Sequence, residues 1–476
     1  MYGDDIVFLP VRELGKKLKA KQISAVELTE TYLDRLEKYG PKYNCVVTVT
    51  RERALTEARA ADAEISKGKY RGPLHGIPYG VKDLLAAEGY NTTFGATPYK
   101  DQKFDKDATV VERLKNAGAI LCAKLAMVEL AGGMGYQQAN ASFTGPGLTP
   151  WNTKYWSGGS SSGPGAAMGA ALVAFAIGSE TNGSIMAPST FCGITGLRPT
   201  YGRVSRHGGM ALSYTMDKLG PMCRTADDCG LVLDTIAGAD PQDPTCVDRP
   251  YRYEALPTSG RKGGKRWRVG VLKDAATNAH PDVKKNFEAS LEVIKQFADI
   301  VPDLVLPDLA FNQVSGLVVG AEGAAAFEDL FESGGIANLT DPACRYNGYS
   351  GVVVLAKDYI KAMRQRRAMS MQFDALLKQV DAIAHPTRTT PAPYADRPFR
   401  ESYTEVRGPS PALGSAENVC GTPGVGMPNG FAPTADNLPT GLQFSARAFD
   451  ENVVLQLAQE YQKRTDWHTK RPPVGV

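Results

Sequence analysis

The chain has 476 residues, of which 43% are hydrophobic and 22% are charged, an ordinary balance for a globular protein with a large buried core. Its formal net charge of +3 gives no electrostatic reason to expect nucleic acid or an acidic membrane surface as a partner. None of the eight cysteines forms a C-x-x-C pair and there are only five histidines, so we expect neither a metal site nor a disulfide framework.

The N-terminal segment carries no recognisable targeting signal. Asp4 and Asp5 come early, and no apolar core of a signal peptide follows them. The most apolar stretch, residues 166–177, is about 12 residues long, whereas a bilayer span needs about 20. We therefore expect a cytoplasmic protein without membrane contact.

The first 125 residues alternate between helical and strand patterns. Residues 9–70 predict helices, with an S-x-x-E capping box at Ser24 and Glu27. A short apolar segment follows over 77–85, then a helix over 109–116 and a buried strand over 119–123. This alternation predicts an α/β core.

Residues 145–165 are rich in glycine, serine and proline, which in most proteins marks a loop or linker. Here they lead into a small-residue helix over 165–171, an apolar strand over 172–177 and a second polar turn, GSETNGS, over 178–184. Two Gly/Ser turns that flank one tight helix and strand predict two loops that meet at one site.

The second half of the chain gives fewer signals. We expect a surface excursion over 240–265, a strand over 267–272, an amphipathic helix over 282–297, a long helix over 352–380 and a closing helix over 455–463. Residues 386–440 are rich in proline and glycine and predict loops, whereas 305–350 has no clear assignment.

Three segments could carry chemistry. Lys82 lies in the apolar segment 77–85, where burial would lower its pKa and allow it to act as a base. The same local sequence also allows a surface pair between Lys82 and Asp83. The turn 178–184 ends at Ser184, and the backbone N–H groups before that serine could form an oxyanion hole. Taken alone, a turn of this kind is more typical of a polar loop.

The other serine-rich turn, GGSSSG over 158–163, allows two interpretations. It contains Ser160, and its last five residues also satisfy G-x-S-x-G with Ser161 at the centre, as in a nucleophile elbow. An elbow needs a strand immediately before it, and residues 152–156 are a poor strand. Taken alone, the turn is also typical of a flexible loop.

Together, these segments closely resemble the amidase signature family. The matching motifs are GPLHGIPYGVKD (72–83), the Gly/Ser-rich region 158–205, the segment 381–391, and AENVCGTPGVGMPNGF with LPTGLQ within 416–443. They follow in the family's order from about residue 10 to residue 460. The resemblance implies an α/β fold, with a large mixed β-sheet core flanked by α-helices, as one domain over residues 1–476. This domain would include N-terminal helices over 9–70 and variable pocket-rim segments at about 305–350 and 395–415.

The resemblance also implies a Ser-Ser-Lys catalytic triad. Ser184 matches the nucleophile, Ser160 the bridging serine that follows a cis peptide bond, and Lys82 the base. The matching oxyanion hole consists of the backbone amides of Thr181, Asn182, Gly183 and Ser184. An acyl-enzyme would form on Ser184, with no cofactor and no metal.

Several positions depart from the family pattern. Glu180 stands where the family usually has Asp, Asn182 where it has Gly, and Met186 where it has Arg. We therefore expect the acid at 180 to lack that arginine partner, and we note that Asn tolerates positive φ. None of these changes removes a member of the triad.

The substrate is expected to be a small-molecule amide or carbamate. Gly132, Gly133 and Met134 would form an adaptable, largely apolar wall, with Tyr136 and Gln137 as further substrate contacts. The segments that can be placed offer no cationic anchor for a substrate carboxylate, which favours a neutral amide, anilide or carbamate.

We therefore expect a stand-alone amidase, monomeric or homodimeric, of the branch that includes urethanase and aryl acylamidase activity. The alternative is the glutaminase subunit of a tRNA-dependent amidotransferase, which would require a partner protein. A third hypothesis is an inactive family member that acts as a scaffold.

Overall fold

The computed structural model describes residues 2–257, 260–261, 263–406 and 412–474. Its centre is a sheet of 11 strands in the order β1-β3-β2-β4-β6-β5-β10-β11-β9-β7-β8. The strands are β1 (Val46–Val49), β2 (Pro78–Lys82), β3 (Ile120–Leu125), β4 (Phe175–Glu180), β5 (Thr195–Arg198), β6 (Lys218–Cys223), β7 (Trp267–Leu272), β8 (Ala298–Leu304), β9 (Ala382–Pro386), β10 (Gly424–Ala432) and β11 (Leu438–Ser445).

The sheet is mixed. Strands β3, β2 and β4 run parallel to one another, as do β9, β7 and β8, and the remaining neighbours pair antiparallel. Every residue of β2, β3 and β4 is buried, as expected for parallel strands that are covered on both faces. The predicted α/β fold with a large mixed sheet is confirmed.

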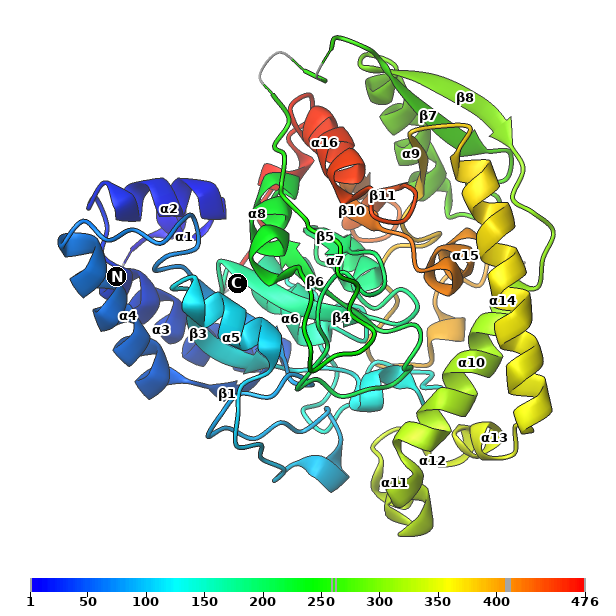
Figure 1. Ribbon diagram of the computed structural model, residues 1–476, viewed down its shortest axis with the longest axis horizontal. Coiled ribbons are helices and arrows are strands. Elements are labelled where there is room, and N and C mark those ends of the chain that lie inside the picture. The colour runs from blue at the N-terminus through cyan, green and yellow to red at the C-terminus, as the bar shows by residue number, and fades with distance from the viewer. Residues whose placement is uncertain (1, 258–259, 262, 407–411, 475–476) are drawn as a thin grey trace.

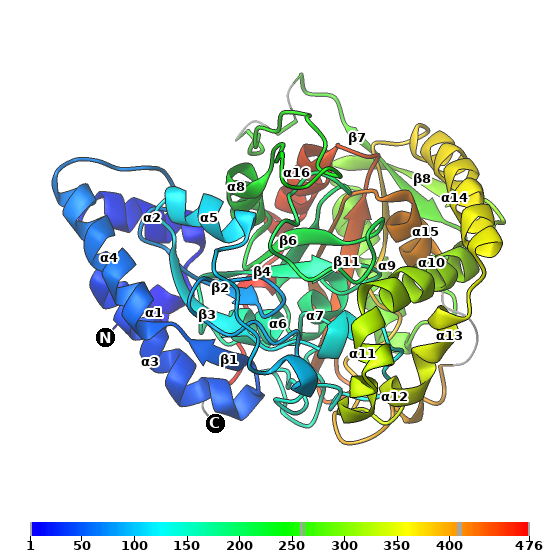
Figure 2. The same ribbon diagram turned by 60° about the horizontal axis from the view of Figure 1, so that its bottom comes forward.

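Helices surround the sheet. They are α1 (Asp4–Val7), α2 (Val11–Lys19), α3 (Ala25–Tyr43), α4 (Arg51–Ser66), α5 (Thr109–Asn116), α6 (Ser162–Gly169), α7 (Met186–Phe191), α8 (Ala226–Ile236), α9 (Pro281–Ile294), α10 (Phe311–Ala326), α11 (Glu328–Glu332), α12 (Cys344–Asn347), α13 (Tyr349–Val352), α14 (Ala356–Leu377), α15 (Leu413–Cys420) and α16 (Glu451–Gln462). Short 3-10 helices cover Thr97–Tyr99, Glu129–Gly132, Gly335–Asn338, Phe399–Glu401 and Trp467–Thr469. Helices α1–α4 gather at one end of the molecule and α10–α14 at the other (Figures 1 and 2).

Local sequence accounts for several of these elements. The Ser24 hydroxyl accepts a hydrogen bond from the Glu27 backbone N–H at 3.1 Å and donates to the Glu27 carboxylate, which begins α3 with the predicted capping box. The helix and strand predicted over 109–116 and 119–123 correspond to α5 and β3. The strand predicted over 172–177 instead covers Phe175–Glu180, because it continues into the polar turn that carries the site.

The prediction of loops over 386–440 is wrong for helix α15 and strand β10. Strand β10 pairs with β5 on one side and with β11 on the other, so this glycine-rich segment lies inside the sheet. Its Pro428 stands beside a shift in the pairing register, where a missing N–H costs little. Helix α15 precedes it, and the unassigned region 305–350 contains α10, α11 and α12.

Candidate active site

Two neighbouring parallel strands bring Lys82 to the site. Lys82 is the last residue of β2, and Glu180 is the last residue of β4. Val81 pairs with Ile177, so the carboxyl ends of both strands reach the same edge of the sheet. In α/β sheets this edge is where ligands usually bind.

The Lys82 side chain is completely buried and lies between two serine hydroxyls. Its Nζ is 2.7 Å from Ser160 Oγ and 2.8 Å from Ser179 Oγ. Burial disfavours the charged ammonium and lowers the pKa of Lys82 from 10.5 to about 7, although the negative charges of Asp217 and Glu180 act in the opposite direction. The surface pair with Asp83 does not form, because Asp83 pairs with the buried Lys124 at 2.8 Å.

Ser160 lies in the first Gly/Ser turn, just before α6. The Gly159–Ser160 peptide bond is cis, as predicted from the family resemblance. Gly158 has a φ of +88°, and a Cβ at that position would lie 2.7 Å from the backbone of Pro188, so only glycine fits there. The turn therefore packs directly against α7, the helix that follows the second turn.

The nucleophile-elbow alternative at Ser161 is wrong. None of the described residues immediately before the turn forms a strand. The Ser161 hydroxyl is fully buried and donates to the backbone oxygen of Ser179 at 3.1 Å, so it ties the two Gly/Ser turns together. The Ser161 N–H also donates to the backbone oxygen of Ser184 at 3.3 Å.

Ser184 closes the second turn and lines a large cavity. Gly183 has a φ of +97°, whereas Asn182 is not among the residues with positive φ, so glycine rather than asparagine takes the left-handed position. Within the described part of the chain, no protein acceptor takes the backbone N–H groups of Asn182, Gly183 or Ser184. Unpaired N–H groups beside a cavity are suited to bind an oxygen of a ligand.

The acid at 180 has a strong partner on another element. The Glu180 carboxylate accepts from the backbone N–H groups of Ile185 at 2.8 Å and Met186 at 3.1 Å, which fixes the turn around Ser184. It also forms an ion pair of 2.9 Å with Arg198 of β5. Burial alone would raise the pKa of Glu180, but the positive charges of Arg198 and Lys218 outweigh this effect. The net result is a lowered pKa, so the carboxylate stays ionised. The acid at 180 has no arginine at position 186, as expected, and Arg198 supplies the positive charge from another strand.

A second set of contacts fixes the start of the same turn. The Thr181 hydroxyl donates to Asp217 at 2.5 Å, and Lys218 Nζ lies 3.5 Å from the Thr181 backbone oxygen. Burial lowers the pKa of Lys218 to about 7. The turn that carries Ser184 is therefore fixed at both ends by buried polar groups.

The main cavity has a volume of about 840 Å³. It is lined by Ala131, Gly132, Gly133, Met134, Gly135, Tyr136, Trp156, Gly159, Thr181, Asn182, Gly183, Ser184, Ala187, Leu212, Asn312, Ser315, Gly316, Val319, Gly320, Tyr346, Asn347, Ser350, Arg388 and Ser415. Of the five residues expected to contact substrate, Gly132, Gly133, Met134 and Tyr136 line this cavity. Gln137 does not, and its backbone N–H instead donates to Asp341 at 3.0 Å.

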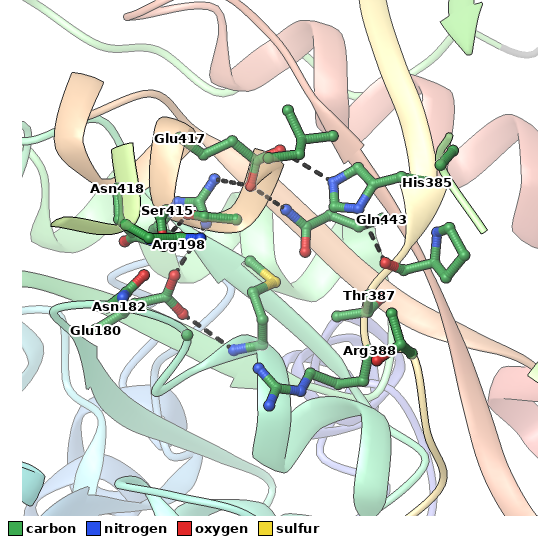
Figure 3. Close-up of a pocket in the computed structure, with 18 residues that line it drawn as sticks. Glu180, Asn182, Arg198, His385, Thr387, Arg388, Ser415, Glu417, Asn418 and Gln443 are labelled. Atoms are coloured by element: carbon green, nitrogen blue, oxygen red, sulfur yellow. Dashed lines mark hydrogen bonds and ion pairs between the residues drawn. The ribbon is translucent and has the colours of Figure 1, made fainter. Parts of the chain in front are cut away.

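A polar cavity of about 370 Å³ adjoins the main cavity and shares five lining residues with it: Asn182, Gly183, Asn312, Arg388 and Ser415. Figure 3 shows its buried network, in which Glu417 accepts from Arg198 at 3.0 Å and from Gln443 at 2.7 Å. His385 Nε2 lies 3.0 Å from the same carboxylate. Burial raises the pKa of Glu417, but the charges of His385 and Arg198 lower it to about 2.

Sequence reasoning missed the charged residue that lines both cavities. Arg388 follows β9 and lines both cavities, so the candidate site contains a cation that the sequence analysis did not identify. Its segment, 381–391, matches the family, but nothing in the local sequence shows that Arg388 lies beside Gly183. The residues around it come from parts of the chain that are far apart, and only the fold brings them together.

The described residues contain no cluster of three side chains that could hold a metal ion. In the same part of the chain, no helix has both the length and the hydropathy needed to cross a bilayer.

The chain matches the model of the Amidase family over residues 27–455. Two curated relatives are A-type subunits of glutamyl-tRNA(Gln) amidotransferases. The one from Methylococcus capsulatus is 36% identical over 489 residues, which cover 98% of both chains. The one from Azoarcus sp. is 36% identical over 493 residues, which cover 97% of this chain and 99% of the relative.

Solved structures give the same class. A chain from the structure of a vestigial protein complex that reveals the evolutionary origins of an s-triazine catabolic enzyme has a TM-score of 0.86 at 28% identity, over 98% of this chain and 100% of that one. The native peptide amidase of Stenotrophomonas maltophilia has a TM-score of 0.82 at 28% identity, over 98% and 99%. The fold and the site thus define a hydrolase that acts on C–N bonds. The chain belongs to the amidase family, as its motifs predict.

Proposed function

We propose that this chain cleaves amide C–N bonds through an acyl-enzyme on Ser184, with Ser160 and Lys82 as the proton relay. The observation that carries the proposal is the buried Lys82, whose Nζ lies 2.7 Å from Ser160 Oγ and whose pKa is lowered to about 7. A lysine with this pKa is partly neutral at neutral pH and can accept a proton, which an ordinary lysine cannot do efficiently.

In the proposed chemistry a proton passes from Ser184 through Ser160 to Lys82 and later returns to the leaving amine. Neutral Lys82 takes the proton of the Ser160 hydroxyl, and Ser160 takes that of Ser184 as its oxygen attacks the substrate carbonyl. The unpaired N–H groups of Asn182, Gly183 and Ser184 stabilise the negative oxygen that forms. The relay then runs backwards to protonate the leaving amine, and water hydrolyses the ester on Ser184.

Two more specific functions fit this chemistry, and the two curated relatives favour the glutaminase subunit. A stand-alone amidase or urethanase would hydrolyse anilides or carbamates as a lone chain. A glutaminase subunit would release ammonia from glutamine for a tRNA-dependent amidotransferase, and both curated relatives named above are amidotransferase subunits that match over nearly their whole length. We therefore rank the glutaminase subunit first and the carbamate hydrolase second.

A substrate panel separates the two. The purified chain is assayed with 4-nitroacetanilide, an aryl carbamate, a primary amide and glutamine, alone and with the other subunits of an amidotransferase. Glutamine hydrolysis that requires the partners supports the glutaminase function, and turnover of anilide or carbamate by the lone chain supports the stand-alone amidase. Turnover that persists in Ser184→Ala would contradict the acyl-enzyme itself.

A further inference from the structure

The main cavity is almost uncharged. Among the described residues that line it, Arg388 is the only one with a charged side chain, and the others are apolar, glycine or neutral polar residues. A Cβ built on Gly183 would lie 3.5 Å from Arg388 Nη1, so the guanidinium stands against the turn that carries Ser184. A single cation beside the proposed nucleophile is a feature that the general amide chemistry above does not use.

Arg388 also has no partner among the residues that the structure describes. It forms no ion pair or hydrogen bond with any described residue, although two buried carboxylates lie in the adjoining polar cavity. Glu180 is held by Arg198 and by the amides of the second turn, and Glu417 by Arg198, His385 and Gln443. In Figure 3 the Arg388 guanidinium lies apart from the Glu417 network.

The surroundings make this isolation costly. Protein atoms around Arg388 lower its pKa by removing water, while the nearby Tyr136 and Glu180 act in the opposite direction. A partly desolvated cation is stabilised by a direct anionic partner, and none comes from the described protein. An arginine presents its N–H donors in a planar fork that matches a carboxylate.

We propose that Arg388 binds a carboxylate group carried by the substrate, so that the preferred substrates are amides with a second, anionic end. This proposal rests on the proposed amide hydrolysis at Ser184. Because Arg388 stands beside Gly183, the carboxylate lies only a few covalent bonds from the scissile carbonyl. One cation among neutral groups fits a singly charged carboxylate better than a doubly charged phosphate, which usually collects several donors or cations.

The position of Arg388 predicts a class of substrates and not one compound. Half-amides of short dicarboxylic acids belong to it, and so do amides of amino acids whose carboxylate is free. Tyr136 lines the same cavity, and its hydroxyl is a second donor available to the anion.

The test compares matched substrates that differ only in the carboxylate. The first pair is the mono-4-nitroanilide of glutaric acid and the 4-nitroanilide of pentanoic acid, which place the charge on the acyl side. The second pair is 4-(butyrylamino)benzoate and butyranilide, which place it on the leaving amine. For the pair that fits the site, Arg388→Leu should lower kcat/KM on the anionic member by about 10- to 100-fold, the loss expected for one charge-assisted hydrogen bond, and lower it far less on the neutral member.

Two controls keep the result specific. Arg364→Leu removes an exposed arginine from α14 and should alter neither member of a pair. Arg388→Lys keeps the charge without the fork and should recover part of the preference for the anion. Thermal unfolding of each variant shows whether the chain still folds.

A binding measurement separates this proposal from the proposed function. Calorimetric titration of glutarate needs no turnover, and we expect binding to the wild-type chain that is lost in Arg388→Leu. If no amide is hydrolysed but glutarate still binds through Arg388, the hydrolytic function fails and the carboxylate site stands. The proposal is overturned if Arg388→Leu lowers activity on neutral and anionic substrates equally, or if glutarate binds both proteins alike or neither.

Discussion

Replacing Lys82 with methionine should abolish activity and yet stabilise the fold at neutral pH. In the folded chain the pKa of Lys82 is about 7, whereas the unfolded lysine has the ordinary value of 10.5. At pH 7 folding therefore removes about half a proton from this side chain and leaves the remaining charge in a buried site. Methionine has a similar length and avoids that cost.

The size of the effect follows from the two pKa values. The cost of lowering the Lys82 pKa is about 4 kcal/mol at pH 7 and falls to about 2 kcal/mol at pH 9, because the unfolded lysine is then closer to losing its proton. Between pH 7 and 10.5 the unfolded state binds more protons than the folded state. The free energy of unfolding of the wild type therefore rises with pH over this window. Methionine also loses the contacts with Ser160 and Ser179, at about 1 kcal/mol each, and this loss does not depend on pH.

Urea unfolding followed by circular dichroism at pH 7 and pH 9 measures both terms. The stability of Lys82→Met relative to the wild type should fall by about 2 kcal/mol between the two pH values. Lys361→Met, which removes an exposed lysine from α14, serves as the control and should show no such change. A difference between Lys82→Met and wild type that is the same at both pH values would refute the argument that Lys82 is held neutral.

Three further predictions follow from the same geometry. The kcat/KM of the wild type should rise with pH and level off with an apparent pKa near 7, because only neutral Lys82 accepts a proton; a flat profile from about pH 5 to 9 would contradict this. Asp217→Asn removes a negative charge that raises the pKa of Lys82, so the midpoint of that profile should move to lower pH, and a move to higher pH would count against it. Glu180→Gln breaks a buried ion pair with Arg198 and should cost about 3–5 kcal/mol of stability in urea unfolding, together with slower labelling of Ser184 by a fluorophosphonate; unchanged labelling would show that Glu180 does not hold the turn.

Sequence motifs predicted which segments meet at the candidate site because these segments follow one another along the chain. Lys82 ends a strand, and both Gly/Ser turns flank the next helix and strand, so neighbouring parallel strands bring them together. The buried state of Lys82 and the cis bond before Ser160 both agree with the family resemblance.

The parts that sequence reasoning missed depend on long-range pairing. Arg198 stands at the end of a fully buried strand, which signals a carboxylate partner, but the identity of that partner depends on how β5 and the second turn come together. Strand β10 was expected as a loop because its glycines and prolines are loop-forming residues, and its place between β5 and β11 overrides that tendency. Arg388 faces a cavity built from distant loops, and no local pattern reveals its direction.

Identification of the residue that carries the acyl group tests the account most directly. The chain is incubated with a fluorophosphonate, or with substrate followed by rapid acid quench, and the modified peptide is identified by mass spectrometry. The account predicts one adduct, on Ser184, which disappears in Ser184→Ala and is strongly reduced in Lys82→Met. An adduct on Ser160 or Ser161, or full turnover with no adduct on Ser184, would contradict it.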